Sequence, residues 1–359
     1  MCIRRLIIIG VTLSIVLFLA ACGGKENTNS TGGESGKGAE EITMVANFLH
    51  PNSHHTVVNA YKPWVEYVEE KTNGRVKVEL YTGGALGSST TVLQDVSGGV
   101  YDFGGPMTPT YHYDTEIFPL TIGDLPFAFS DIESAANVMD QFIEKHAQET
   151  FKDIVYMGVT ANDPFTLISS KPINTFEQMK GLKIKVGGTV AGELAKSLGS
   201  TPVAIAYEDT YDALQKGIVD AALFPGTGSI SNSYYEVAPY MTNIPAYMSY
   251  NVPVMNRAFY DNLPDDLKKL FEEDLAPKLV ELYEDTYLAE IEKLETEWID
   301  AGGNEFINLP EEEMKKFKRT AKPIWDQWVE EANKRGYPGE EMMEDFIELI
   351  ESEGLETPF

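Results

Sequence analysis

Residues 165–198 decide the fold class and read FTLISSKPINTFEQMKGLKIKVGGTVAGELAKSL. Short runs rich in β-branched and apolar residues predict strands at Phe165–Ser169 and Leu182–Val186. A short helical turn is predicted between them at Phe176–Met179, and a helix led by glycines at Val190–Leu198. Alternating strands and helices indicate an α/β fold, because such units favour parallel sheets with helices on both faces.

The same alternation continues on both sides of this stretch. We predict further strands at Ile42–Asn47, Arg75–Tyr81, Tyr101–Gly104 and Asp220–Phe224, and helices at Val57–Lys71, Val92–Gly98 and Tyr207–Lys216. From Pro264 onward the chain is expected to be mostly helical, with the acidic runs 311–313 and 340–341 on solvated helix faces. Two α/β units without a long linker predict two lobes that face a cleft, where ligands of open α/β sheets bind.

The start of the chain predicts an exported lipoprotein. Two arginines precede the apolar run Leu6–Leu19, which is shorter than the roughly 20 residues of a membrane span and fits a signal peptide. The sequence Leu19-Ala20-Ala21-Cys22 resembles a bacterial lipobox, so we expect residues 1–21 to be removed and Cys22 to carry lipid. Residues 22–40, rich in Gly, Ser, Thr and Asn, predict a flexible tether. The alternatives are an ordinary signal peptide and an uncleaved anchor.

The composition narrows the class of partner. The chain carries 56 acidic and 28 basic residues, which give a formal net charge of −28. Such a charge argues against nucleic acid as a partner and against electrostatic docking to anionic lipid. The two cysteines, Cys2 and Cys22, both lie at the N-terminus, so we expect no disulfide and no cysteine-based metal site in the body.

Several segments together resemble the DctP-type extracytoplasmic receptors of TRAP (tripartite ATP-independent periplasmic) transporters. The resemblance is carried by Ser169–Ile173, Met179–Val186, Leu198–Val203 and Tyr211–Asp220, with Thr72–Val76, Gly83–Gly87 and Asn262–Pro264 in agreement. It implies a two-lobed receptor of the periplasmic-binding-protein kind (type II-like), without catalytic activity. Such a receptor closes on an organic acid and delivers it to a two-part membrane permease driven by an ion gradient.

In this family the chain crosses between the lobes more than once. The resemblance therefore implies that lobe I comprises residues 41–160 plus about 250–290, and lobe II residues 161–249 plus about 291–335. Residues 336–359 form a C-terminal helical extension in this division. We expect the protein to lie outside the cytoplasm, held to the membrane through Cys22.

Lys185 occupies the position where the family places an arginine that forks onto the ligand carboxylate. An ammonium is a compact point charge without the planar, two-pronged geometry of a guanidinium. Lys185 could therefore hold one carboxylate oxygen, and backbone N–H groups of the following turn at Gly188 could assist. The alternative is that Lys185 points to solvent from a strand edge.

Two further departures from the family pattern are apolar. Phe224 stands before Pro225 where dicarboxylate-binding and sialic-acid-binding members commonly show Asn, and Phe165 lies near a place where some relatives carry another arginine. Each aromatic could be a core residue. Together with Lys185 they predict a ligand with a single carboxylate and an apolar or aromatic body, and not a C4-dicarboxylate.

The first lobe offers polar residues beyond its strands that could reach the ligand. The full set of candidate ligand contacts is Lys185, Phe165, Phe224, Asn47, His50, His54, Met107, Tyr111, Gly188 and Tyr207. A zinc site of His50, His54 and His112 with one carboxylate is the alternative for the histidines, although we predict no metal and no cofactor.

An enzyme is the main alternative from another class. The sequence contains no Gly-x-Ser-x-Gly elbow, no His-Glu-x-x-His motif, no phosphate-binding loop and no cysteine nucleophile in the body. A C4-dicarboxylate receptor, or a receptor that serves a sensor or an ABC-type permease, also stays open at this point.

Overall fold

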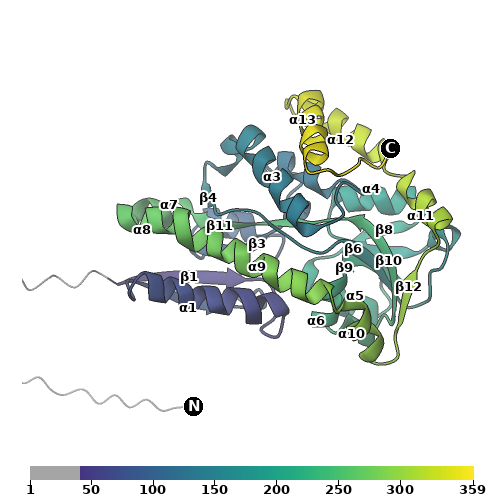
Figure 1. Ribbon diagram of the computed structural model, residues 1–359, viewed down its shortest axis with the longest axis horizontal. Helices are drawn as coiled ribbons and strands as arrows, with labels where there is room; N and C mark the ends of the chain where they lie inside the picture. Colours follow the sequence, from purple (N-terminus) through teal and green to yellow (C-terminus); the bar gives the residue numbers. More distant parts are fainter. Residues whose placement is uncertain (1–40) are drawn as a thin grey trace, which may run out of the picture. The chain divides into compact units, whose positions relative to one another are not determined.

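The computed structural model describes residues 41–359, so the predicted signal peptide, Cys22 and the tether lie outside the described residues. Two six-stranded sheets organise this part of the chain (Figure 1). The first sheet runs in the order β2-β1-β3-β11-β4, with β5 also paired to β11. Its strands are β1 (Ile42–Phe48), β2 (Val76–Tyr81), β3 (Phe103–Met107), β4 (Ile154–Tyr156), β5 (Thr160–Ala161) and β11 (Tyr250–Asn256).

The second sheet runs in the order β12-β10-β6-β9-β7-β8. Its strands are β6 (Phe165–Ser169), β7 (Lys183–Val186), β8 (Thr201–Ala204), β9 (Ala221–Pro225), β10 (Tyr240–Tyr247) and β12 (Glu305–Asn308). The two sheets confirm the predicted two-lobed α/β architecture. The chain passes from the first sheet to the second between β5 and β6, returns between β10 and β11, and passes again before β12.

The helices surround both sheets (Figure 1). Those of the first half are α1 (Lys62–Lys71), α2 (Val92–Ser97), α3 (Ile132–His146), α4 (Thr189–Ser197), α5 (Thr210–Gln215) and α6 (Gly226–Ser231). Those of the second half are α7 (Arg257–Asn262), α8 (Asp265–Leu270), α9 (Ala276–Ile291), α10 (Leu294–Asp300), α11 (Glu311–Lys318), α12 (Lys322–Lys334) and α13 (Gly339–Ser352). Within residues 41–359, none of them is long and apolar enough to span a membrane.

The C-terminal helices pack on segments from the middle of the chain. The indole nitrogen of Trp325 donates to the Pro126 carbonyl at 3.1 Å, and that of Trp328 donates to Thr121 Oγ1 at 3.0 Å. On α13, Phe346 meets Phe142 of α3 edge to face. These buried contacts attach α12 and α13 to residues of the predicted lobe I, and the assignment of each range to a lobe stays a prediction.

The expectation of parallel sheets is wrong in part, because both sheets are mixed. The strands β10 and β11 run antiparallel to β6 and β3 respectively. Sequence reasoning missed both strands because Pro245 and Pro253 interrupt them, and proline argues against a central strand. The structure accommodates these prolines at irregularities, since the pairing register shifts between Thr242 and Tyr247 and between Val252 and Val254.

A further difference concerns β3, which continues beyond the predicted strand end at Gly104 through Gly105 and Pro106 to Met107. A side chain at Gly104 would come within 2.6 Å of Val96 Cγ2, so the glycine lets α2 pack directly on the strand. The glycine there reflects close packing, and the short β3 extends as far as Met107.

Candidate functional site

A small cavity lies where the two sheets meet. It is lined from the first sheet side by Leu49, His50, His54, Ser89, Pro106, Thr108, Tyr111, Asn251 and Tyr287, and from the second by Asn162, Phe165, Tyr207, Phe224, Pro225 and Gly228. Its free volume is about 40 Å³, which accommodates roughly three water molecules. The walls therefore stand in a closed arrangement.

Lys185 lies directly behind the aromatic wall of this cavity. The strand β7 lies between β9 and β8, and Lys185 pairs with Ala222 of β9. Its side chain is fully buried, with Nζ 3.5 Å from Tyr111 Oη and 5.1 Å from the centre of the Phe224 ring. The alternative that Lys185 points to solvent from a sheet edge is therefore wrong.

The electrostatics of Lys185 are those of a cation that lacks a counter-charge. Among residues 41–359, Nζ forms no ion pair, and Tyr111 is its one hydrogen-bond partner. Burial lowers the pKa of the Lys185 ammonium to about 7, although the Glu208 carboxylate acts in the opposite direction. A buried ammonium without an anion is costly to charge, so an incoming carboxylate would find a site prepared for it.

The rings of Tyr111 and Phe224 lie beside this ammonium, and further aromatic rings pack around Phe224 and Phe165. Phe165 stacks obliquely on Tyr247 with ring centres 4.3 Å apart, and Phe224 packs against Tyr207 at 5.2 Å. Phe165 and Phe224 lie on the neighbouring strands β6 and β9, where Phe165 pairs with Pro225, and their ring centres are 6.3 Å apart. The two residues thus belong to the buried core and also line the cavity.

The histidines contribute neutral polar groups. His50 and His54 stack with ring centres 4.0 Å apart and planes 14° apart, and both rings line the cavity. Burial, with a smaller contribution from His55, lowers the pKa of His50 to about 3. Burial also lowers the pKa of His54 well below its usual value, and the neighbouring histidines add to this shift. Both imidazoles are therefore uncharged near neutral pH.

Four predicted contacts do not line the cavity: Lys185, which lies behind the Phe224 ring, and Asn47, Met107 and Gly188. Asn47 is buried and its Oδ1 accepts from the Leu86 amide at 3.3 Å, and Met107 is buried in the core at the end of β3. Gly188 lies at the start of α4, where an added Cβ would stand 1.9 Å from the Thr110 carbonyl oxygen. The glycine thus permits the start of α4 to approach the backbone at Thr110 closely.

The histidine metal site finds no support in the part of the chain that the structure describes. His112 Nε2 is fully buried without a partner, whereas His50 and His54 face the cavity. No group of three or more His, Cys, Asp or Glu side chains within residues 41–359 is arranged to hold a metal ion.

Sequence reasoning missed a polar network on the crossing strands. Asn251 of β11 donates from Nδ2 to Asn162 Oδ1 and to Tyr283 Oη, both at 2.9 Å. Thr108 Oγ1 donates to Asn251 Oδ1 at 2.7 Å. Asparagines next to otherwise apolar strands, at Asn162 and Asn251, were the available signal. The network fixes the strands beside the cavity where the chain changes sheets.

Two further contacts join the sides around the cavity. The Glu208 carboxylate accepts from the Ser89 amide at 2.8 Å and from its hydroxyl at 2.9 Å. His55 Nδ1 lies 2.7 Å from Ser231 Oγ on α6. Together with the contact of Gly188 on Thr110, these pairs hold the closed arrangement.

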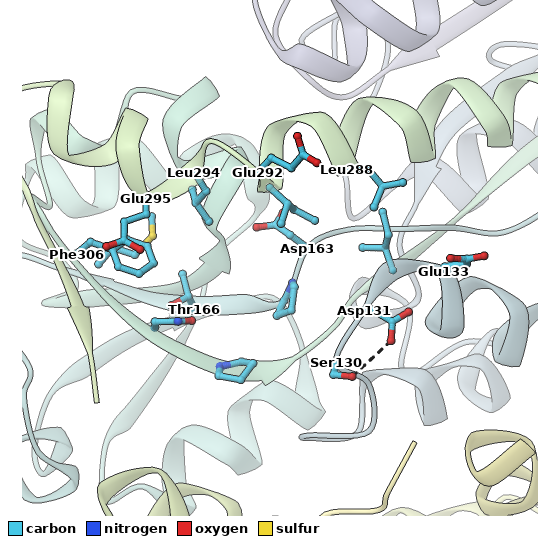
Figure 2. A pocket seen from close by; sticks show the side chains of 16 residues that line it. Ser130, Asp131, Glu133, Asp163, Thr166, Leu288, Glu292, Leu294, Glu295 and Phe306 are labelled. Atoms are coloured by element: carbon cyan, nitrogen blue, oxygen red, sulfur yellow. Dashed lines mark hydrogen bonds between the residues drawn. The ribbon is translucent and has the colours of Figure 1, made fainter. Parts of the chain in front are cut away.

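A larger hollow of about 550 Å³ lies elsewhere, beside the end of α9 and the start of α10 (Figure 2). Figure 2 shows apolar side chains such as Leu288, Leu294 and Phe306 with carboxylates around them. Its lining residues include Asp131, Glu133, Asp163, Glu292 and Glu295, and none of them is Lys, Arg or His. An anionic ligand would be repelled there, so the smaller cavity beside Lys185 is the better site for an acid.

Comparison with known proteins identifies the family of this chain. Residues 48–332 match the family described as bacterial extracellular solute-binding protein, family 7 (DctP). The C4-dicarboxylate-binding periplasmic protein DctP of Rhodobacter capsulatus is 27% identical over 273 residues, which cover 74% of this chain and 80% of that protein.

Solved structures share the fold. A TRAP solute-binding protein of Rhodoferax ferrireducens in complex with copurified benzoate has a TM-score of 0.79 at 24% identity, covering 87% of this chain and 98% of that one. A Shewanella oneidensis TRAP periplasmic solute-binding protein with bound succinate has a TM-score of 0.75 at 19% identity, covering 86% and 99%. The chain therefore belongs to the DctP family, the solute-binding receptors of TRAP transporters.

Proposed function

We propose that this receptor captures a monocarboxylate whose body is apolar or aromatic. The observation that carries the proposal is Lys185, a fully buried ammonium with no ion-pair partner among residues 41–359 and with Phe224 and Tyr111 beside it. One carboxylate satisfies one such cation. The surrounding rings supply apolar surface, whose burial contributes about 25 cal/mol per Å².

A second carboxylate would lack a partner in this cavity. The lining residues include no lysine and no arginine, and the histidines at the cavity are neutral near pH 7. A buried carboxylate without a counter-charge costs several kcal/mol, which opposes binding of a dicarboxylate.

The relatives do not decide the ligand by themselves. The protein of Rhodoferax ferrireducens holds benzoate and that of Shewanella oneidensis holds succinate, yet both share less than a quarter of their residues with this chain. These likenesses support the receptor fold, and the choice between ligand classes rests on the cavity of this chain.

Delivery to a two-part permease driven by an ion gradient completes the proposed role. The DctP family is a family of transport receptors and not of enzymes, and its members are periplasmic and work with membrane permeases. We infer in addition that lipid on Cys22 holds this receptor at the outer face of the membrane. The support is the lipobox-like Leu19-Ala20-Ala21-Cys22 and the Gly- and Ser-rich segment after it.

A calorimetric panel of acids tests the ligand class. We expect benzoate or phenylacetate to bind and to raise the melting temperature, while succinate and malate do not. Tight binding of succinate, with no response to any monocarboxylate, would overturn the proposal and favour a C4-dicarboxylate receptor.

For the anchor, Cys22→Ser should release the protein from the membrane fraction; retention of the variant there would contradict lipidation at Cys22.

A further inference from the structure

The hydroxyl of Thr56 connects the two stacked histidines of the cavity. Thr56 is fully buried, and its Oγ1 lies 2.7 Å from His50 Nδ1 and 2.8 Å from His54 Nδ1. A hydroxyl has one hydrogen, so it can donate to one of the two rings and must accept from the other if both bonds form. The two imidazoles are therefore coupled in their tautomeric states.

A backbone group determines which of the two Nδ1 atoms accepts a hydrogen bond from the Thr56 hydroxyl and which donates one to it. The amide N–H of Thr56 donates to His54 Nδ1 at 3.3 Å, and a backbone amide is always a donor. His54 Nδ1 must then present its lone pair, because a hydrogen on that nitrogen would collide with the amide hydrogen. The Thr56 hydroxyl consequently donates to His54 Nδ1 and accepts from His50 Nδ1–H.

The assignment of Nδ1 fixes the opposite nitrogen of each ring. A neutral imidazole carries one hydrogen, so His54 bears it on Nε2 and His50 presents a bare Nε2. The low pKa values of both rings agree with neutral imidazoles. Nε2 of neither ring has a partner among residues 41–359, and neither is among the fully buried unpaired atoms, in contrast to His55 Nε2.

From this relay we infer that the ligand carries a hydroxyl group, which donates to His50 Nε2 and accepts from His54 Nε2–H. The inference rests on the proposed function, because the carboxylate of the same ligand pairs with Lys185. A hydroxyl is the small group that matches one donor and one acceptor on parallel rings 4.0 Å apart. The substrate class is thus a hydroxy-substituted monocarboxylic acid with an apolar body.

A ligand that displaces the water of the cavity without offering this hydroxyl leaves both ring nitrogens unpaired. Unsatisfied buried polar groups weaken binding by roughly tenfold to hundredfold. Thr56 acts here as a positioning residue, since its own hydroxyl is occupied by the two rings and reaches the ligand only through them.

Isothermal titration with pairs of acids tests the inference. The probes are benzoate against its 2-, 3- and 4-hydroxy derivatives, and phenylacetate against mandelate. We expect at least one hydroxy acid to bind tenfold or more tightly than its parent. In Thr56→Val this ratio should fall toward one, while Thr286→Val, which removes another buried hydroxyl that bonds within α9, should leave the ratio unchanged.

The outcomes separate the two proposals. If parents and hydroxy acids bind equally, the hydroxyl inference is overturned while the monocarboxylate proposal stands. If none of these acids binds, the proposed function itself fails. Nitrogen-15 spectra of histidine-labelled protein provide a readout that needs no ligand: we expect Nδ1–H on His50 and Nε2–H on His54, and the same tautomer on both rings would overturn the relay.

Discussion

Replacing Lys185 by methionine tests the origin of binding most directly. Methionine keeps the length and apolar stem of the side chain but removes the charge that burial disfavours. In the empty protein, burial lowers the pKa of Lys185 from 10.5 to about 7. Below pH 7, where the buried side chain is charged, this shift corresponds to a loss of at most roughly 5 kcal/mol in the free energy of unfolding. We therefore expect Lys185→Met to raise the melting temperature of the empty protein and to abolish binding of monocarboxylates.

The same shift predicts how binding depends on pH. Above pH 7 the empty protein loses the Lys185 proton, and a carboxylate ligand must restore it, so the dissociation constant should rise about tenfold per pH unit. Between pH 7 and pH 9 the loss of affinity is roughly hundredfold. His50 and His54 do not titrate in this range because their pKa values lie at about 3 or well below 6.5.

The stability of the empty protein should change in the opposite sense. The unfolded chain keeps the Lys185 proton up to about pH 10.5, whereas the folded protein releases it near pH 7. The unfolded state therefore binds more protons between these values, and this residue makes stability rise with pH across that window.

Calorimetry from pH 6 to pH 9 in buffers of different ionisation enthalpy measures both affinity and proton uptake. Lys185→Arg is the matched control, because a guanidinium stays charged throughout and its binding should not vary with pH. A constant dissociation constant for the natural protein from pH 6 to pH 9, or undiminished binding by Lys185→Met, would refute the reasoning.

Three further predictions concern the closed arrangement and the core. Gly188→Ala places a Cβ 1.9 Å from the Thr110 carbonyl oxygen, so ligand affinity should fall at least about tenfold while the melting temperature changes little; Gly192→Ala on the same helix, which has room for a methyl group, is the control, and equal affinities would contradict this contact. Glu208→Ala removes two partly buried hydrogen bonds to Ser89, so titration should show an affinity loss of roughly fivefold; Glu193→Ala on α4, whose half-buried carboxylate pairs with Lys196 of the same helix, should show none. Asp124 is fully buried without an ion-pair partner among residues 41–359, and burial raises its pKa well above the usual value although the Thr110 hydroxyl acts in the opposite direction. The natural protein therefore loses stability as the pH rises above about 4, so urea unfolding should find Asp124→Asn about 1–3 kcal/mol more stable at pH 8 and the difference shrinking at pH 4; an unchanged difference would exclude titration of Asp124 as its cause.

Much of the fold follows from local patterns. The alternation in residues 165–224 predicted β6, β7, α4 and β9 to within about two residues, because each is an apolar or amphipathic segment bounded by turn residues. The strands that carry the chain between the sheets were missed. Their prolines and polar residues fit only because neighbouring strands supply register shifts and hydrogen-bond partners, and such partners are invisible in a single sequence.

The site residues that could be predicted are those whose side-chain type is unusual for their position in the sequence. Lys185 stands out as a lysine within an apolar strand, and Phe165 and Phe224 as aromatic residues on neighbouring strands. The roles of Asn47 and Gly188 depended on which atoms meet across the sheets, which sequence spacing does not encode. Thr56 carried no signal either, since its importance arises from two histidines that the fold brings to one hydroxyl.

The enclosure of the cavity has a kinetic consequence. A space of about 40 Å³ is too small for an organic acid, so every molecule that enters or leaves must wait for the walls to separate. The residence time of the solute is then governed by the opening rate and not by diffusion out of the site. A membrane partner that separates the two walls would shorten this residence time at its own surface. The receptor would then hold its solute tightly in solution and release it only where it contacts that partner.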